Sequence, residues 1–200
     1  MASSLATKYG SMTPSQCSAE VRKRKLPIDF VRGQKGISTP VRIVGPLHGV
    51  KFAAPGEGRV NGILDCRLAL ALDDFGAVMA RHNVVQIYGE FYRANAHIAG
   101  TRKLSQHAFG LAMDFTSVQL RDKRSLTIER DWHGVVGDPP CGPDAHPMDP
   151  TEETLALRNL ICEVARKGIF HFMLTPGYNL AHRNHFHFDI QRKSPGMAIR

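Results

Sequence analysis

The feature that most constrains the fold of this sequence is an apolar stripe within residues 63–81. Large apolar side chains recur there at spacings of three and four residues, namely Leu64, Leu68, Leu72, Phe75 and Met79. This spacing lines one face of an α-helix, and such a face is stabilised by packing against a core. Asp73 and Asp74 interrupt the stripe, so it is too polar for a membrane span of about 18 apolar residues. The stripe predicts a helix over 63–81 that packs on a core.

Further helices and strands are predicted on both sides of this segment. A second strong helix begins at 149–152, where a capping residue, a proline and an acid follow one another, and it stops at Gly168. A shorter helix starts at Thr13, with Pro14 in its first turn, and ends before Pro27. Strand patterns occupy residues 41–44, 84–88, 169–174 and 185–190. Helices flanking a small, mostly antiparallel sheet make an α+β fold.

Length and composition fit one folded domain. The chain has 200 residues, of which 42% are hydrophobic and 22% charged, and this composition excludes a wholly disordered protein. We expect a single domain over residues 14–192, between an N-terminal tail at 1–13 and a C-terminal tail at 193–200. The proline- and glycine-rich segment 134–147 is expected to be an ordered surface loop, a kind of segment that often carries function.

The net charge and the histidines limit the classes of partner and of reaction that fit this sequence. The net charge of +8 favours an anionic partner, which is nucleic acid, anionic lipid or an acidic polymer such as a bacterial cell wall. Six of the ten histidines lie between His133 and His187. Histidine is the commonest metal ligand and the usual acid or base near neutral pH, so the late histidines indicate a chemical site.

Four cysteines are widely spaced and form no CxxC pair: Cys17, Cys66, Cys141 and Cys162. This spacing argues against a zinc knuckle and against a thioredoxin-type redox motif. Two disulfides with any of three pairings, or four unpaired thiols, both fit the sequence. The first ten residues lack the apolar core of a secretory signal.

The candidate strand over 185–190 carries two histidines in phase. Because side chains alternate along a strand, one face carries His185, His187 and Asp189, and the other carries Phe186, Phe188 and Ile190. The apolar set is expected to face a core, which directs the polar set to a cleft or to solvent. Two neighbouring histidines can bind one metal ion together, or one can bind it while the other transfers protons.

A second polar group lies within residues 105–115. Asp114 stands in an apolar strand pattern, and a carboxylate is costly to bury unless it is paired or bound to a metal. A catalytic zinc ion has three protein ligands and one open position. His107, Asp114 and His187 supply that number and leave His185 as a general base. The alternative is that His107 and Asp114 have unrelated roles in a loop that enters a strand.

These blocks resemble a known family. The block from His107 to Asp114, followed by His185-Phe-His187, resembles the LAS zinc peptidases, which include lysostaphin-type endopeptidases, D-Ala-D-Ala carboxypeptidases and the murein endopeptidase. The bacterial extensin-like C-terminal domain is a closer match, with its Tyr-Gly…Arg segment ending here at Arg93. The resemblance covers about residues 14–190 and implies a LAS-peptidase-like single domain.

The resemblance also implies roles for the polar residues. The three candidate ligands named above correspond to the zinc ligands of the family. His185 corresponds to the general base, which takes a proton from the attacking water and passes it to the leaving amine. Arg93 corresponds to an arginine that binds the substrate or polarises its carbonyl. His182 either donates a hydrogen bond to the oxyanion or orients a ligand, and Asp189 supports a ligand or is a structural acceptor. Trp132 either lines the groove or belongs to the core.

The resulting hypothesis is a zinc-dependent peptidase that cuts stem or cross-link peptides of peptidoglycan, with Zn²⁺ as cofactor. The expected partner is peptidoglycan or its muropeptides, with no nucleic acid and no membrane span, and the protein is expected to be a monomer. Its expected location is the periplasm or the cell exterior, with the export signal not present in this chain.

Three alternatives come from other functional classes. The first is a metal-containing domain that has lost catalysis and only binds wall polymer. The second is a nuclease, because His182-Arg183-Asn184-His185 superficially resembles an HNH site. An HNH site spreads these residues over a hairpin and a helix, whereas here they are crowded before a strand. The third, a metal-independent nucleic-acid binder, lacks a recognised binding motif.

Overall fold

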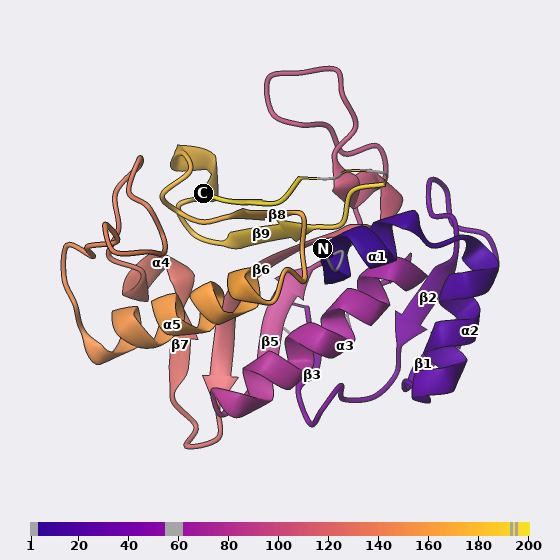
Figure 1. Ribbon diagram of the computed structural model, residues 1–200, viewed down its shortest axis with the longest axis horizontal. Helices are drawn as coiled ribbons and strands as arrows, with labels where there is room; N and C mark the ends of the chain where they lie inside the picture. Colours follow the sequence, from indigo (N-terminus) through magenta and orange to yellow (C-terminus); the bar gives the residue numbers. More distant parts are fainter. Residues whose placement is uncertain (1–3, 55–61, 193, 195) are drawn as a thin grey trace.

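The computed structural model describes residues 4–54, 62–192, 194 and 196–200 (Figure 1). The helices are α1 (Leu5–Ser11), α2 (Pro14–Arg24), α3 (Cys66–Arg81), α4 (Ile128–Asp131) and α5 (Glu152–Arg166), with 3₁₀ turns η1 (Gln106–Phe109) and η2 (Leu180–His182). The strands are β1 (Ile28–Phe30), β2 (Pro40–Ile43), β3 (Lys51–Ala53), β4 (Leu64–Asp65), β5 (Val84–Glu90), β6 (Ala112–Leu120), β7 (Ser125–Thr127), β8 (Phe172–Leu174), β9 (Phe186–Asp189) and β10 (Ala198–Ile199). Residues 1–3, 193 and 195, which belong to the expected tails, lie outside the described residues.

The helix α3 confirms the prediction from the apolar stripe. The Asp65 carboxylate caps its first turn by accepting a hydrogen bond from the Arg67 backbone N–H (3.0 Å). The helix begins at Cys66 rather than at residue 63, because Leu64 and Asp65 pair with β2 as the short strand β4. In the described part of the chain, no helix is long and apolar enough to cross a bilayer.

The other two predicted helices are present, but the N-cap residue of α5 differs from the prediction. α2 begins with a capping box in which Thr13 and Gln16 bond each other's backbone N–H groups. α5 is capped by Thr151, whose hydroxyl accepts a hydrogen bond from the Thr154 N–H (3.2 Å). The predicted cap at Asp149 is therefore wrong. Only the residue directly before the first turn places its side-chain oxygen near those N–H groups.

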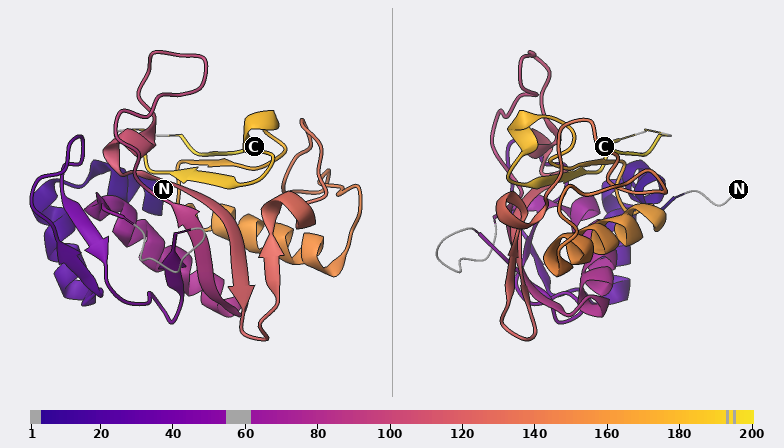
Figure 2. Two further views of the ribbon diagram at one scale, coloured as in Figure 1. Left: turned by 180° about the vertical axis from the view of Figure 1, so that it is seen from behind. Right: turned by 90° about the vertical axis from the view of Figure 1, so that its left-hand side faces the viewer.

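A mostly antiparallel sheet of seven strands dominates the described residues, as predicted. Its strand order is β10-β8-β9-β6-β5-β3, with β7 paired to β6 (Figure 2). The pairings are antiparallel except β3 with β5 and β8 with β10, which are parallel. A separate sheet has the order β1-β2-β4. The fold is thus α+β. The strands β1 and β3 were not predicted, because three residues carry too little alternation to recognise.

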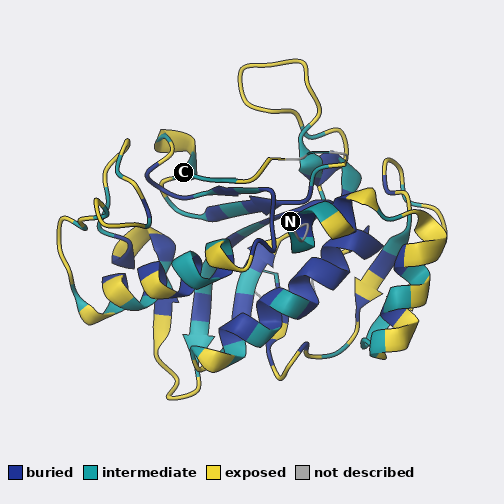
Figure 3. Cartoon of the chain, viewed as in Figure 1, coloured by how far each residue is buried: buried dark blue, intermediate teal, exposed yellow. Residues whose placement is uncertain are grey.

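The helices α3 and α5 cover one face of the larger sheet (Figure 2). Phe75 of α3 packs against Phe115 of β6 and Phe188 of β9, with ring centroids 6.0 and 5.8 Å apart. Phe186 of β9 is also fully buried. The long helix α3 and the central strands are largely buried (Figure 3). These contacts use the apolar face that the alternation in β9 predicts, and they direct the intervening side chains of both strands to the opposite face.

Both chain ends contribute packed elements where tails were expected. In α1, the buried Tyr9 donates a hydrogen bond to Asp74 of α3 and accepts one from the Arg24 guanidinium (2.8 Å). Arg24 also pairs with Asp73 (2.9 Å), so one polar network joins α1, α2 and α3. At the other end, β10 extends the sheet beside β8. The folded unit therefore begins before residue 14 and extends past residue 192.

Two disulfides resolve the alternatives that the sequence left open. Cys17 pairs with Cys66 and joins α2 to the first residue of α3. Cys141 pairs with Cys162 and joins the loop before α5 to that helix. Each bond links segments that are far apart in the sequence, and it restricts the unfolded chain more when the loop it closes is longer.

The two disulfides are expected to differ in their effect on stability. Replacing Cys17 and Cys66 by serine opens a loop with a sequence separation of 49 and is expected to cost about 4 kcal/mol of unfolding free energy. Replacing Cys141 and Cys162, separated by 21 residues, is expected to cost about 3 kcal/mol. Urea unfolding of both double variants measures the two losses. Equal stability of the Cys17/Cys66 variant and the wild type would contradict this assignment.

Candidate metal centre

Strand pairing brings a carboxylate and a histidine together. β6 and β9 are antiparallel neighbours in which Asp114 lies directly opposite His187. Side chains at directly opposite positions project from the same face with Cβ atoms about 5 Å apart. Because Phe115 and Phe186 fill the helix-covered face, Asp114 and His187 project from the other one. This is the placement that the alternation of the sequence predicts.

A tight turn supplies the third residue, His107 of η1. The Ser105 hydroxyl caps this turn by accepting a hydrogen bond from the His107 N–H (3.3 Å). Gly110 ends the turn with a φ of 63°. A Cβ at this glycine would meet the side chain of Ile37 at 2.8 Å and the backbone nitrogen of Asp65 at 2.9 Å. Glycine therefore allows the chain to turn into β6 here, and His107 is buried beside the strands (2% exposed).

In the described part of the chain, one group of three residues has ligand atoms close enough to share a metal ion: His107, Asp114 and His187. The Nε2 atom of His107 lies 3.0 Å from Asp114 Oδ1 and 3.2 Å from His187 Nδ1. The His187 Nδ1 atom lies 2.8 Å from the same Asp114 oxygen. The three ligand atoms thus form a small triangle. The structure brings together all three of the ligands expected from the sequence.

Hydrogen bonds on the outer side of each ring fix which nitrogen faces the triangle. The Nδ1–H of His107 donates to the backbone carbonyl of Phe91 (2.7 Å), which can only accept. The Nε2–H of His187 donates to Asp189 Oδ2 (3.4 Å). In the neutral rings, the inner nitrogens therefore carry lone pairs. Two imidazole lone pairs and a carboxylate oxygen repel one another unless a cation or a proton lies between them.

The pKa values follow from this crowding. Burial alone raises the pKa of Asp114, but hydrogen bonds from His107 and His187 outweigh it and hold that pKa well below its usual range. Burial lowers the pKa of His187, whereas the bonds to Asp114 and Asp189 raise it more strongly, to about 9. The triangle therefore attracts positive charge.

The donor set fits a zinc ion. Zinc binds imidazole nitrogen and carboxylate oxygen at about 2.0–2.2 Å in tetrahedral geometry. Tetrahedral ligands at that distance lie about 3.3 Å apart, close to the 2.8–3.2 Å separations of the three atoms here. Three protein ligands leave one position open, which is the pattern of catalytic rather than structural sites.

His185 and His182 lie beside the triangle. The His185 Nε2 atom is 3.7 Å from Asp114 Oδ1, and its Nδ1–H donates to Asn184 (3.0 Å). Burial lowers the pKa of His185, although the charge of Asp114 opposes this. The His182 ring centroid is 5.0 Å from that of His185, and its Nδ1–H donates to Asn179 (2.7 Å). Burial, followed by the charges of nearby histidines, lowers the pKa of His182 to about 4.

Arg93 reaches the centre from the loop that follows β5. Its Nη2 donates to Asp114 Oδ2 at 2.9 Å, and the Arg93 side chain is 55% exposed. Its backbone N–H donates to the carbonyl of His107 (3.3 Å), so the loop is attached to η1. The guanidinium thus lies at the solvent side of the carboxylate, where it can also contact a ligand.

Three supporting groups were not found from the sequence. The Phe91 carbonyl has no sequence pattern, because every residue has one. Asn184 is adjacent to His185 in the sequence, but its contact depends on the local turn. Gly89 lies at an irregularity in the pairing of β5 with β6, and a Cβ there would overlap the carbonyl oxygen of Asp114. A glycine inside a strand pattern is the signal that indicates such a close approach.

The remaining late histidines lie elsewhere. His171 is buried and accepts a hydrogen bond from the Gln191 N–H (2.9 Å), while its other nitrogen donates to the Ser194 carbonyl (3.1 Å). His133 lies 3.9 Å from the Asp149 carboxylate. The late concentration of histidine therefore combines site residues with structural ones.

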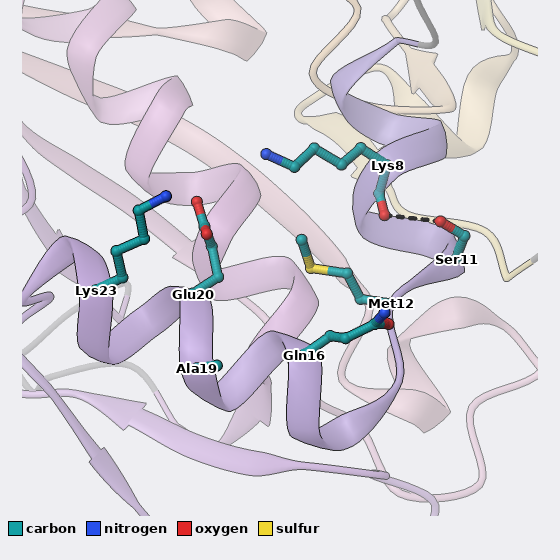
Figure 4. A pocket seen from close by; sticks show the side chains of 7 residues that line it. All are labelled: Lys8, Ser11, Met12, Gln16, Ala19, Glu20 and Lys23. Carbon is teal, nitrogen blue, oxygen red and sulfur yellow. Dashed lines mark hydrogen bonds between the residues drawn. The ribbon is translucent and has the colours of Figure 1, made fainter.

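Two surface hollows are formed by described residues near the helices α1, α2 and α4. A groove of about 460 Å³ runs between the α4 region and η2 and is lined by Ile128, Glu129, Arg130, Trp132, His133, Gly134, Val135, Val136, Pro176, Leu180 and Arg183. We call it the α4 groove, and it shares η2 with the metal centre. A second hollow of about 440 Å³ lies between α1 and α2, lined by residues such as Lys8, Glu20 and Lys23 (Figure 4). None of the candidate site residues lines it.

Comparison with known families identifies one match. Residues 15–199 match the family described as extensin-like protein C-terminus. Because the match covers nearly the whole chain, the protein belongs to this family. The matched range includes η1, β6, β9 and the loop that carries Arg93. No match is found among curated proteins or among solved structures.

The first prediction from this geometry concerns metal content. After zinc loading and desalting, the wild type is expected to retain about one zinc ion per chain. His187→Ala and Asp114→Ala each remove a ligand and are expected to lose it. Elemental mass spectrometry measures the content, and His146→Ala, which removes an exposed histidine, is the matched control. A folded wild type that retains no metal would contradict the site.

The second prediction concerns Gly89. Gly89→Ala forces β5 away from β6 at Asp114 and is expected to weaken zinc binding about 10-fold or more and to destabilise the fold by about 1–3 kcal/mol. Gly62→Ala is the control, because a Cβ at Gly62 meets no atom within 4 Å. Competition with a chelating dye measures the affinity. Unchanged affinity in Gly89→Ala would show that the close approach does not position Asp114.

Proposed function

We propose that this member of the extensin-like family is a zinc-dependent peptidase that hydrolyses peptide bonds in bacterial cell-wall peptidoglycan, in stem peptides or in cross-links. One observation carries the proposal. Three ligand atoms from His107, Asp114 and His187 lie within 4.8 Å of one another, and both imidazoles are oriented by acceptors on their outer side. A cluster of ligand atoms whose rings are already oriented, with a further histidine beside it, is typical of metal-assisted hydrolysis.

His107, Asp114 and His187 would hold a zinc ion and leave one coordination position free for water or substrate. When bound, a zinc ion polarises a substrate carbonyl and lowers the pKa of a coordinated water toward about 7. The protein contributes the geometry. The Phe91 carbonyl and Asp189 keep both rings in the tautomer whose inner nitrogen can bind a cation. The aromatic packing behind β6 and β9 keeps these strands, and so their ligands, in place.

His185 fits the general base. Its Nδ1–H is directed to Asn184, so its Nε2 is a proton acceptor on the side of Asp114. Its lowered pKa keeps the ring neutral near pH 7 and able to take a proton from the attacking water. The protonated ring can then donate that proton to the nitrogen of the leaving amine, which completes hydrolysis of the peptide bond.

Arg93 and His182 fit supporting roles. The exposed guanidinium of Arg93 can hold the carbonyl or a carboxylate of the substrate next to the reacting bond. In His182, Nδ1–H donates to Asn179, so Nε2 is an acceptor in the neutral ring. Of the two roles expected for His182, orientation of a neighbouring group fits this tautomer better than donation to an oxyanion.

The choice of substrate and location rests on more general properties. The net charge of +8 suits an anionic wall polymer. Two disulfides suit the periplasm or the cell exterior, where thiols are oxidised. The resemblance of both histidine blocks to LAS peptidases supports the same substrate class.

The division of roles predicts a separation of metal binding from catalysis. His185→Ala is expected to keep about one zinc ion per chain and to lose about 10²–10⁴-fold in kcat, because it removes only the proton acceptor. Elemental analysis and chromatography of digested muropeptides measure the two quantities, and His146→Ala is the control. Loss of zinc from His185→Ala would contradict the division. A zinc-loaded wild type that binds muropeptides and cleaves none would replace the peptidase by the wall-binding alternative.

A further inference from the structure

A buried arginine outside the metal centre lacks a hydrogen-bond partner. Arg158 of α5 is 6% exposed. Among the described residues, no acceptor bonds its Nε, Nη1 or Nη2, and the buried Nε1 of Trp132 is also unpartnered. A guanidinium removed from water without an acceptor is strongly unfavourable. A negatively charged group bound to these donors would therefore stabilise the buried guanidinium, and no described residue bonds it.

The unpartnered donors converge on one point. The Arg158 guanidinium stacks on the Trp132 ring, with Cζ 4.5 Å from its centroid. A Cβ built on Gly134 would lie 2.6 Å from Trp132 Nε1 and 3.0 Å from Arg158 Nη2. Both nitrogens thus lie close to Gly134, where any larger side chain would overlap them.

Asp138, the acid whose charge acts on Arg158, forms no hydrogen bond with these donors. Burial lowers the pKa of Arg158, and the charge of Asp138 only partly opposes this effect. The Asp138 carboxylate instead accepts a hydrogen bond from the Val135 N–H (3.0 Å). The positive charge of Arg158 is therefore compensated incompletely.

This point lies at the wall of the α4 groove. Trp132 and Gly134 line the groove, where Arg183 adds a positive charge. Arg130 and Glu129 line it as well, and Arg130 is paired with Asp131 (2.7 Å). Val135 and Val136 are exposed, so the segment that covers the donors faces solvent. Because Gly134 lies close to both donors, a small anion drawn into the groove can reach them only if residues 134–136 shift outward.

We propose that Arg158 and Trp132 form a carboxylate-binding site beneath residues 134–136 in the α4 groove. The planar guanidinium matches the two oxygens of a carboxylate with parallel N–H donors. The indole N–H adds a third donor beside them. The carboxylate belongs either to a free small acid or to a peptide that lies in the groove.

Trp132 gives a specific readout, because it is the single tryptophan of the chain. Acetate is titrated into the metal-free protein at constant ionic strength, with chloride as the replaced anion, and the Trp132 indole N–H resonance is followed by NMR. A saturable downfield shift is expected, since the indole then donates to a carboxylate oxygen. Acetamide, which has the same shape without the charge, is expected to cause no shift.

Two variants distinguish acetate binding at Arg158 from acetate binding at other arginines. Arg158→Met is expected to fold, because it removes an unpaired buried charge, and to lose the acetate-dependent shift. Arg183→Met, which removes an arginine that lines the same groove, is expected to keep it. A shift that persists in Arg158→Met, or an equal response to acetamide, would overturn the proposal, as would an indole resonance that acetate leaves unchanged.

A final comparison identifies the source of the carboxylate. A short peptide with one acidic side chain, capped at both ends, is compared with acetate in the same titration. Half-saturation at a concentration at least tenfold lower for the peptide assigns the site to a peptide in the groove. Equal concentrations assign it to a free small acid. Both readouts are independent of peptidase activity, so failure of the proposed function leaves this test intact.

Discussion

The antiparallel pairing of β6 with β9 is the interaction on which the rest of this structure depends. The pairing places Asp114 opposite His187 on one face and Phe115 opposite Phe186 on the other. The aromatic face is held by Phe75 of α3, so the burial of a long apolar helix also fixes the distance between two polar side chains. A shift of this register by one residue would exchange the two faces and remove both the core and the site.

The candidate metal centre brings three potential acceptor atoms together, and the fold holds them there. His107 and His187 each donate their outer N–H to a fixed acceptor, so their inner nitrogens meet Asp114 at about 3 Å. These nitrogens carry lone pairs in the neutral rings and donate to the carboxylate only when they hold a proton. His107 is buried and the other two side chains are mostly buried, which strengthens the repulsion between neutral rings and carboxylate. A cation held by all three atoms would remove this repulsion, which is the physical basis of the proposed zinc site.

The site beneath the α4 groove has the opposite electrostatic character. There, donors of Arg158 and Trp132 converge without an acceptor, on the apolar side of β9, where Trp132 packs edge-on against Phe186 at 5.0 Å. The strand β9 therefore separates the candidate metal centre from the proposed carboxylate site. Leu180 of η2 lines the α4 groove, and His182 of the same turn lies beside the candidate metal centre.

The sequence by itself determined the helix stripe around Phe75, the alternation in β9 and the three candidate ligands, because these depend on spacing along one segment. The cap of α5, the disulfide partners and the packing of Tyr9 were decided by the tertiary structure, since each joins segments that no local pattern relates. The same holds for the Phe91 carbonyl behind His107 and for the unpartnered Arg158. Local periodicity tells which face a side chain occupies, and only packing decides what that side chain meets there.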